Sequence, residues 1–206
     1  MPLARIMRIM NFAFRQVIFI NWVEPIRDLH IVESIAKDFK YSKSATGKRN
    51  YILWCIGIYC GLRVSDILRL KVRDVRNKDE INIIERKTGK RRFYPLPPPI
   101  KAVLNEYCRG KDKNDYLIAK LSCNSPIKRC QAYKIISDAA TKYGLTSIGT
   151  HTMRKTFGYW FYKQTGDVSM LMTIFGHSCE AETLRYIGVT KSVIKEAVRN
   201  FRPFKI

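Results

Sequence analysis

Residues 151–186 read HTMRKTFGYWFYKQTGDVSMLMTIFGHSCEAETLRY, and they set the architecture that the sequence predicts for the chain. Glycine and aspartate punctuate this stretch at the places where helices end and begin. Three consecutive helices are expected: 151–165 ended by Gly166, one capped by Asp167 and ended at Phe175-Gly176, and a short one over 180–186. This part of the chain is therefore predicted to be helical, with tight connections.

Four polar side chains of this stretch are ones that a hydrophobic core would not require. His151 and Arg154 are three residues apart, so a helix places both on one face. Gly176-His177-Ser178 follows a helix end, and Tyr186 comes nine residues after His177. Each has an ordinary explanation when taken alone, since most of the 11 tyrosines should simply pack. Their occurrence together, in this order, points to a functional site.

Two segments further upstream carry more polar positions. CGLRVSDIL at residues 60–68 places Arg63 between two helices, with Asp66 three residues on, and a surface ion pair is the ordinary interpretation. EINIIER (80–86) and RRFYPL (91–96) read as strands around Lys87-Thr88-Gly89-Lys90, which predicts a hairpin with Lys87 in its turn. As one basic residue in a solvated hairpin, Lys87 needs no functional explanation by itself.

The remaining chain is mostly helical in pattern and contains no internal repeat. Further helices are expected over 27–40, 49–60 closed by Gly61, 65–70 capped by Ser65, 97–108 opened by Pro97 to Pro99, 125–144 begun at Ser125-Pro126, and 190–201 capped by Thr190. The predicted fold class is therefore mainly α with a small β-hairpin or sheet, that is, α+β.

The charge of the chain indicates its class of partner. Among 206 residues, 38 Lys and Arg stand against 17 Asp and Glu, which gives a formal net charge of +21. A hydrophobic content of 46% excludes a disordered chain, because that much apolar surface offsets the entropy of ordering a core. The surplus implies a polyanionic partner, either nucleic acid or an anionic membrane surface. A basic protein that is merely soluble is the plain alternative.

The N-terminal residues 1–22 are apolar but contain Arg5, Arg8 and Arg15, so no run approaches the ~20 apolar residues that cross a bilayer. A signal peptide fits poorly as well, because Arg15 splits the apolar stretch. A membrane-surface helix, a connecting segment and a buried helix remain as interpretations.

The six cysteines are scattered and form no C-x-x-C pair, which favours free thiols in a reducing cytoplasm. Cys55, Cys60 and Cys130 fall in apolar periodic stretches and are expected to pack as small hydrophobes. Cys179 and the histidines of residues 151–186 match no zinc spacing, so we expect no metal.

The ordered set of motifs resembles the catalytic domain of the tyrosine recombinase, or phage integrase, family. GLRVSDILRL is similar to the family's first arginine box, ERKTGKRRFYPL to its lysine hairpin, and HTMRKTFGYWF to its His-x-x-Arg box. FGHSCEAETLRYIGV is similar to its Gly-His-Ser motif and following nucleophilic tyrosine. The resemblance runs from about Ile26 to Phe201, and six positions in the family's order and spacing make it specific.

The resemblance implies an enzyme that breaks and rejoins DNA through a 3′-phosphotyrosyl intermediate, with no metal and no cofactor. The residue types suit that reaction, because a phenol must attack a phosphodiester that already carries negative charge, and guanidinium groups stabilise the charge that develops. The implied roles are Tyr186 as nucleophile, Arg63, Arg154 and His177 as phosphate ligands, His151 as proton acceptor, Lys87 as general acid, and Asp66 as the residue that holds Arg63 or a histidine in place.

The resemblance also divides the chain. Residues 25–206, with the C-terminal helix 190–201, correspond to the catalytic domain, and residues 1–24 form a preceding segment, a remnant or linker. The family's N-terminal DNA-clamping domain is therefore expected to be absent. The implied partners are double-stranded DNA and further copies of the chain, as a homotetramer on DNA joined through the C-terminal helix, with no membrane and a cytoplasmic setting.

Site-specific recombination or integration by a mobile element is the leading prediction. One alternative is a non-catalytic DNA-binding regulator that retains the recombinase fold, although the presence of all six positions argues against it. Another is a topoisomerase-like enzyme that relaxes DNA with the same residues.

Overall fold

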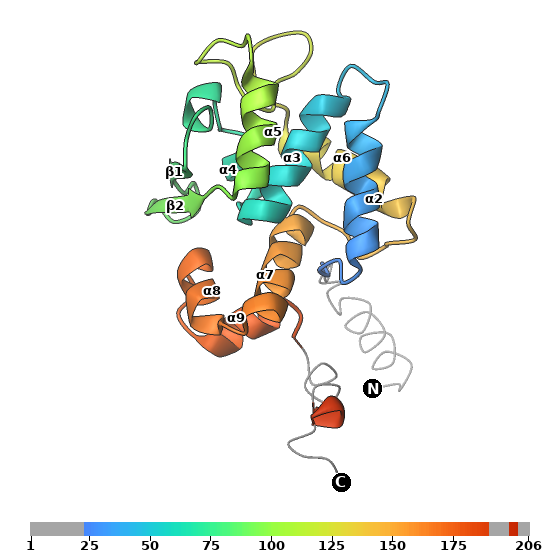
Figure 1. Cartoon of the computed structure of the whole chain (residues 1–206), viewed down its shortest axis with the longest axis vertical. Helices are drawn as coiled ribbons and strands as arrows, with labels where there is room; N and C mark the ends of the chain where they lie inside the picture. The colour runs from blue at the N-terminus through green and yellow to red at the C-terminus, as the bar shows by residue number, and fades with distance from the viewer. Residues whose placement is uncertain (1–22, 190–197, 202–206) are drawn as a thin grey trace, which may run out of the picture.

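The computed structural model describes residues 23–189 and 198–201 of the chain. These residues are mainly helical with one two-stranded antiparallel sheet, which confirms the predicted fold class. The elements in chain order are α2 (Leu29–Lys40), α3 (Gly47–Cys60), α4 (Val64–Ile67), the 3-10 helix η1 (Val72–Asp74), β1 (Glu80–Ile84), β2 (Arg91–Pro95), α5 (Pro98–Cys108), α6 (Arg129–Thr141), α7 (Thr152–Thr165), α8 (Val168–Phe175) and α9 (Glu180–Tyr186). Figure 1 shows α7, α8 and α9 gathered at one end of the molecule, with the β1–β2 hairpin beside α4 and α5.

Helix α3 is the centre of the main core. It is apolar on most of its surface, and it packs against α2, α5 and α7 with Trp54 fully buried. A second, smaller cluster under α8 and α9 contains Leu171, Phe175 and Ile187. These helices approach α7 closely at Gly158, which has no side chain. A Cβ at this position would lie 2.6 Å from Ile187 and 2.7 Å from the ring of Phe175. Close packing therefore fixes Tyr186, at the end of α9, relative to α7.

The junction of α3 and α4 differs in one detail from the prediction. Gly61 ends α3 in the left-handed conformation, with φ 64°, as expected. The predicted N-cap, Ser65, is wrong: Arg63 occupies the N-cap position, and its carbonyl accepts the N–H groups of Asp66 at 2.8 Å and Ile67 at 3.0 Å. The sharp turn at Gly61 brings Arg63 to the start of α4, which ends at Ile67 instead of Leu70.

The predicted hairpin is confirmed. Strands β1 and β2 pair in register from Glu80↔Pro95 to Ile84↔Arg91. The turn closes through two bonds, Glu85 N–H to the Lys90 carbonyl at 3.0 Å and Gly89 N–H to the Glu85 carbonyl at 2.9 Å. Alternation along the strands sends Ile81 and Tyr94, which are register partners, into the core.

The predicted start of α6 is wrong. Ser125-Pro126 does not begin this helix, because 125–127 pair with 118–120 in a short antiparallel bridge and stay extended. The helix begins at Arg129, and the Gln131 side chain accepts the Lys128 N–H at 2.9 Å to cap it. A Ser-Pro pair before an apolar run fits an extended entry segment as well as a helix start.

The helices of the 151–186 stretch have the predicted boundaries. Gly166 and Gly176 both follow a helix in the left-handed conformation, and the Asp167 side chain accepts the Met170 N–H at 2.7 Å at the start of α8. The predicted helix 190–201, with its Thr190 cap, lies mainly outside the described residues, of which 198–200 are helical. In the described ranges, no helix is both long and apolar enough to cross a membrane.

All six cysteines are free thiols. Cys55 and Cys60 are buried in the core as predicted, and burial raises the pKa of the Cys60 thiol to about 12, which leaves it unreactive. The expectation that Cys130 packs as a hydrophobe is wrong, because it lies exposed in the first turn of α6.

Candidate active site

Tyr186 and His151 meet although 35 positions separate them in the chain. Tyr186 is the last residue of α9, His151 stands at the N-cap of α7, and the Tyr186 hydroxyl and His151 Nδ1 share a hydrogen bond of 3.1 Å. Burial raises the pKa of Tyr186 above its ordinary value, against the opposing charges of Arg154 and Arg63. A phenol in this environment stays protonated at neutral pH and needs a base to become a nucleophile.

His151 has the properties of that base. Partial burial of the imidazole, together with the charges of Arg154 and Arg129, lowers the pKa of His151 below its ordinary value. The neutral ring, which can accept a proton, is therefore the main form at neutral pH.

His177 also lies beside the tyrosine, with its ring centroid 5.1 Å from that of Tyr186. Its Nδ1 is 3.0 Å from the hydroxyl of buried Thr183, and that hydroxyl donates to the Cys179 carbonyl at 3.3 Å. The threonine oxygen can thus accept from His177 Nδ1, which orients the ring and leaves Nε2 for another partner. Burial lowers the pKa of His177, with Glu182 acting in the opposite direction.

Arg154 is buried at the base of this group, with 2% of its surface exposed. It donates to the Gly61 carbonyl at 2.6 Å and to the Phe175 carbonyl at 3.2 Å, and its guanidinium lies 4.3 Å from the centroid of the Phe175 ring. The side chain therefore joins the C-terminal ends of α3 and α8, whose carbonyl groups favour a cation. Its charge is brought close enough to Tyr186 to act on the pKa of that residue.

Arg63 does not pair with Asp66, and that part of the prediction is wrong. Its Nη1 donates to Glu85 Oε1 instead. Asp66 Oδ1 accepts the backbone N–H of Arg86 at 3.0 Å, while its Oδ2 is buried and has no hydrogen-bond partner among the described residues. Asp66 therefore holds the backbone of the hairpin turn.

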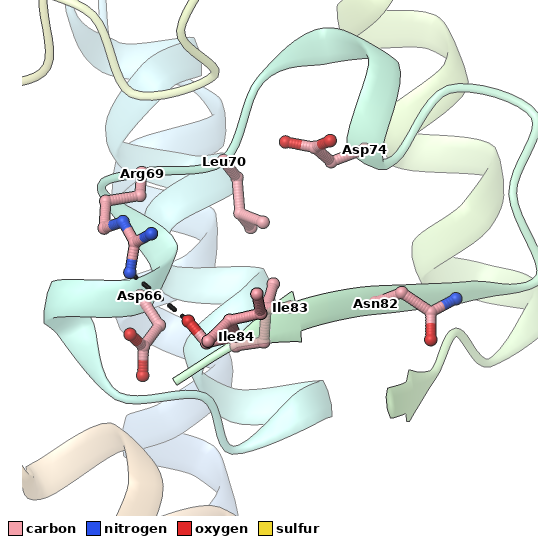
Figure 2. Close-up of a pocket in the computed structure, with 7 residues that line it drawn as sticks. All are labelled: Asp66, Arg69, Leu70, Asp74, Asn82, Ile83 and Ile84. Atoms are coloured by element: carbon pink, nitrogen blue, oxygen red, sulfur yellow. Dashed lines mark hydrogen bonds between the residues drawn. The ribbon is translucent and has the colours of Figure 1, made fainter. Parts of the chain in front are cut away.

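A pocket of about 210 Å³ opens between α4, η1 and β1, on the side where Asp66 lies. Figure 2 shows the Asp66 carboxylate turned away from Asp74, and Arg69 donating to the Ile84 carbonyl at 3.3 Å. The two carboxylates of this pocket do not converge. Within the described ranges, no group of three or more His, Cys, Asp or Glu residues is arranged to hold a metal ion.

Lys87 is exposed in the hairpin turn between β1 and β2, where the sequence placed it. Its charge contributes, after burial and the charges of Arg154 and Arg63, to the lowered pKa of His177. The turn is therefore close to the histidine, and the flexible Lys87 side chain can reach a ligand bound there.

Three residues near the site have no role in the sequence prediction: Glu85, Tyr94 and Lys155. Glu85 is 1% exposed and accepts from Arg63, from the Thr88 hydroxyl at 2.7 Å and from the Tyr94 hydroxyl at 3.0 Å. Lys155 donates to the Val23 carbonyl at 2.7 Å, and its ammonium lies 5.3 Å from the centroid of the Tyr186 ring.

A signal for Glu85 was present in the sequence. Strand alternation places Ile81, Ile83 and Glu85 on one side of β1 and its extension, so the carboxylate continues the buried face. A buried acid in a basic chain requires a cationic partner.

The six polar positions thus surround one small region. The charge of Arg63 influences the pKa of His151, His177 and Tyr186, which only nearby charges do. A phenol with a base, two guanidiniums, a second histidine and a mobile ammonium is an arrangement for attack on a phosphodiester.

The comparisons with known proteins agree with this geometry. The model of the phage integrase family matches residues 29–192. The probable integrase/recombinase YoeC of Bacillus subtilis is 41% identical over 179 residues, which cover 87% of this chain and 97% of that protein. The type 1 fimbriae regulatory protein FimE of Escherichia coli is 29% identical over 150 residues, covering 69% of this chain and 75% of that protein.

Solved structures share the fold. The XerA recombinase superposes with a TM-score of 0.70 at 22% identity, covering 88% of this chain and 65% of that one. The XerH recombinase bound to its difH substrate also gives 0.70 at 22% identity, covering 87% and 53%. The catalytic domain of bacteriophage HP1 integrase gives 0.58 at 17% identity, covering 86% and 95%.

The chain thus spans just under two thirds of XerA and about half of XerH, but almost all of YoeC and of the HP1 catalytic domain. The predicted family is confirmed, because the family model covers most of the chain and YoeC is similar over nearly its full length. This chain belongs to the phage integrase family, the tyrosine recombinases that break and rejoin DNA.

Proposed function

We propose that this chain cleaves and rejoins double-stranded DNA at a specific site through a 3′-phosphotyrosyl link to Tyr186. The observation that carries the proposal is the 3.1 Å hydrogen bond between the Tyr186 hydroxyl and His151 Nδ1, in a region where Arg63 and Arg154 act on both groups.

The proposed reaction proceeds in one displacement. The Tyr186 oxygen attacks phosphorus and its proton passes to His151, while the bond from phosphorus to the 5′-oxygen breaks. Lys87 gives a proton to that leaving oxygen. The reverse displacement by a 5′-hydroxyl restores a phosphodiester and frees Tyr186, so rejoining needs no nucleotide hydrolysis.

Three groups stabilise the charge that develops on the phosphate: Arg63, Arg154 and His177. An arginine has five N–H donors, and the two carbonyl bonds of Arg154 use two of them. Donors held in place before the reaction stabilise the transition state without reorganisation, which is the largest electrostatic contribution in many enzymes.

The same proposal includes DNA binding by this chain through its positive charge. XerH is bound to difH substrate in its structure, and the Tn1549 integrase is in complex with circular intermediate DNA. A net charge of +21 supplies the phosphate contacts that a comparable complex needs. We propose that residues 25–206 act as the catalytic unit, in the cytoplasm and on DNA.

Assembly on DNA is proposed as a homotetramer joined through the C-terminal residues 190–201. An apolar groove of about 920 Å³ between α2, α3, β2, α7 and α8 offers a surface for such a segment of a second copy. Val198 and Phe201 are exposed apolar side chains of suitable character, at 67% and 69% exposure.

A selection from a randomised library tests the function. Nicked duplexes of random sequence are incubated with the protein, and DNA that resists SDS is recovered from protein adducts and sequenced. Recovery of one sequence class, often an inverted repeat, is expected for a site-specific recombinase. Adducts without sequence preference, together with relaxation of any supercoiled plasmid, would favour a topoisomerase-like enzyme, and DNA binding without adducts would favour a regulator.

A further inference from the structure

Glu85 is a buried carboxylate to which the mechanism above gives no role. It follows β1 directly and has 1% of its surface exposed. Its position is costly for phosphate binding, because a negative charge beside Arg63 opposes the approach of a second anion. We therefore ask what its hydrogen bonds contribute to the geometry of the site.

The carboxylate joins three segments of the site. Oε1 accepts from Arg63 Nη1, at the junction of α3 and α4, and from the Tyr94 hydroxyl on β2 at 3.0 Å. Oε2 accepts from the hydroxyl of Thr88, in the hairpin turn, at 2.7 Å. Burial would raise the pKa of Glu85, but the bond from Thr88 and the charge of Arg63 outweigh it, so that the pKa is lowered and the group stays ionised.

The backbone of the same residue closes the turn that carries Lys87. Glu85 N–H donates to the Lys90 carbonyl at 3.0 Å, and the Glu85 carbonyl accepts from Gly89 N–H at 2.9 Å. The Thr88 hydroxyl, held by Glu85, accepts the Lys90 N–H at 3.3 Å. Lys87 is itself exposed, so the place from which its ammonium reaches out depends on this turn.

We propose that Glu85 is a positioning residue that anchors the Lys87 turn to Arg63, so that the general acid reaches the leaving oxygen of the phosphate that the guanidinium binds. This role rests on the proposed function. It accounts for a carboxylate in a site that binds an anion, because fixed geometry compensates for the weakened attraction.

A change of leaving group provides the test. In a duplex from the selection above, the bridging 5′-oxygen of the scissile phosphate is replaced by sulfur. A thiol has a pKa near 8.5, so the sulfur leaves without a general acid. Glu85→Leu is expected to slow cleavage of the oxygen substrate about 10- to 100-fold, less than the roughly 10²- to 10⁴-fold that a general acid contributes, because Lys87 is displaced and not removed. The same variant is expected to cleave the sulfur substrate at nearly the wild-type rate.

Two further variants complete the design. Glu80→Leu makes the same change at the exposed start of β1, where the side chain accepts only locally from Asn82 at 2.8 Å, and should cleave both substrates normally. Thr88→Val removes the bond to the turn and leaves the partner of Arg63 in place. Thr88→Val should slow cleavage of the oxygen substrate less than Glu85→Leu does, and it should also cleave the sulfur substrate at nearly the wild-type rate.

The outcomes separate the two proposals. Equal slowing of both substrates by Glu85→Leu, or no slowing of either, would overturn the positioning role. If thermal unfolding shows that Glu85→Leu does not fold, exposed Thr88→Val decides by the same criterion. A wild-type protein that forms no adduct with either substrate would overturn the proposed function, and the role of Glu85 with it.

Discussion

Tyr186 and His151 form a nucleophile and base whose surroundings shift both pKa values in useful directions. Burial raises the pKa of the phenol, so it carries its proton until the reaction begins. Partial burial and the charges of Arg154 and Arg129 lower the pKa of His151, so it is ready to accept that proton. The 3.1 Å contact makes the transfer direct.

The lowered pKa of His151 predicts the pH dependence of cleavage. The base is active when neutral, and its pKa lies below the ordinary value of 6.5, so the acidic limb of the activity profile should have its midpoint below pH 6.5. Arg63, Arg154, Arg129 and Lys155 all favour the neutral form. Single-turnover cleavage rates across pH test this, and His151→Gln should lose the acidic limb. A decline centred at or above pH 6.5 would contradict the assignment.

The planar guanidinium of Arg63 provides a second prediction. Arg63→Lys keeps the charge but loses the planar fork, so cleavage should fall about 10²- to 10³-fold while non-covalent DNA affinity stays nearly unchanged. Arg73→Lys is the matched control, because Arg73 is exposed and bonds to Asn114 away from the site. Near-normal cleavage by Arg63→Lys would mean that the planar guanidinium is not needed to bind the phosphate.

The sequence predicted site residues where a motif contained them, but it did not predict which residues they bond to. Arg63 was found, but spacing suggested Asp66 as its partner, whereas the fold supplies Glu85 from 22 positions away. Such a pairing depends on how the hairpin docks on α4, which local spacing does not specify. Strand alternation indicates that Glu85 continues the buried face of β1, but it does not indicate which cation the carboxylate meets.

Among the elements, the hairpin and α8 are joined by one side chain. Arg92 on β2 donates to the Thr173 carbonyl at 3.1 Å, near the C-terminus of α8. Its guanidinium also occupies the space beside Gly176, where a Cβ would lie 2.2 Å from Nη2. The hairpin that carries Lys87 is thereby tied to the residue preceding His177.

This contact predicts the effect of filling Gly176. Gly176→Ala should lower the free energy of unfolding by more than Gly144→Ala. Both residues have positive φ, 69° and 72°, but only at Gly176 must the end of the Arg92 side chain move aside and give up its bond to the Thr173 carbonyl. The shared cost of a left-handed alanine is about 1–2 kcal/mol. Urea denaturation measures both.

The double-mutant cycle identifies the source of the difference. In an Arg92→Ala background, the excess cost at Gly176 should disappear. Equal losses at the two glycines in the wild-type background would contradict the close packing of Arg92 on Gly176.

Element boundaries were predictable where the chain uses glycine or a capping aspartate. Gly61, Gly166 and Gly176 all adopt the left-handed conformation that ends a helix, which few other residues tolerate. Ser125-Pro126 misled, because proline fixes φ in a range that suits both the first turn of a helix and an extended strand. The bridge between Ala119 and Pro126 selects the second, and it depends on residues earlier in the chain.

At the scale of the whole molecule, folding brings distant motifs to one place. The Arg154 side chain binds the carbonyl of Gly61 across 93 positions, and the hairpin reaches α8 across 81. The order of the motifs could be read from the sequence, but the distances between them come from the packing of α7 against α3 and α8.

The net charge of +21 predicts strong salt dependence of DNA binding. Each phosphate neutralised adds about 0.9 to the slope of log affinity against log salt, so affinity should fall about 10³-fold or more between 50 and 200 mM salt. Fluorescence anisotropy with Tyr186→Phe, which cannot react, measures the salt dependence of non-covalent DNA binding alone. A nearly flat dependence would mean that the surplus charge does not contact the DNA backbone.

The chemical identity of the DNA–protein link tests the assignment of Tyr186 most directly. After cleavage of a selected duplex, digestion with nuclease and protease followed by mass spectrometry should locate a 3′-phosphonucleotide on Tyr186, with a free 5′-hydroxyl on the other DNA end. Tyr186→Phe should form no adduct, whereas Tyr133→Phe, at an exposed tyrosine on α6, should react normally. DNA attached to another residue, or an SDS-resistant adduct of Tyr186→Phe, would contradict the assignment of Tyr186 as the nucleophile.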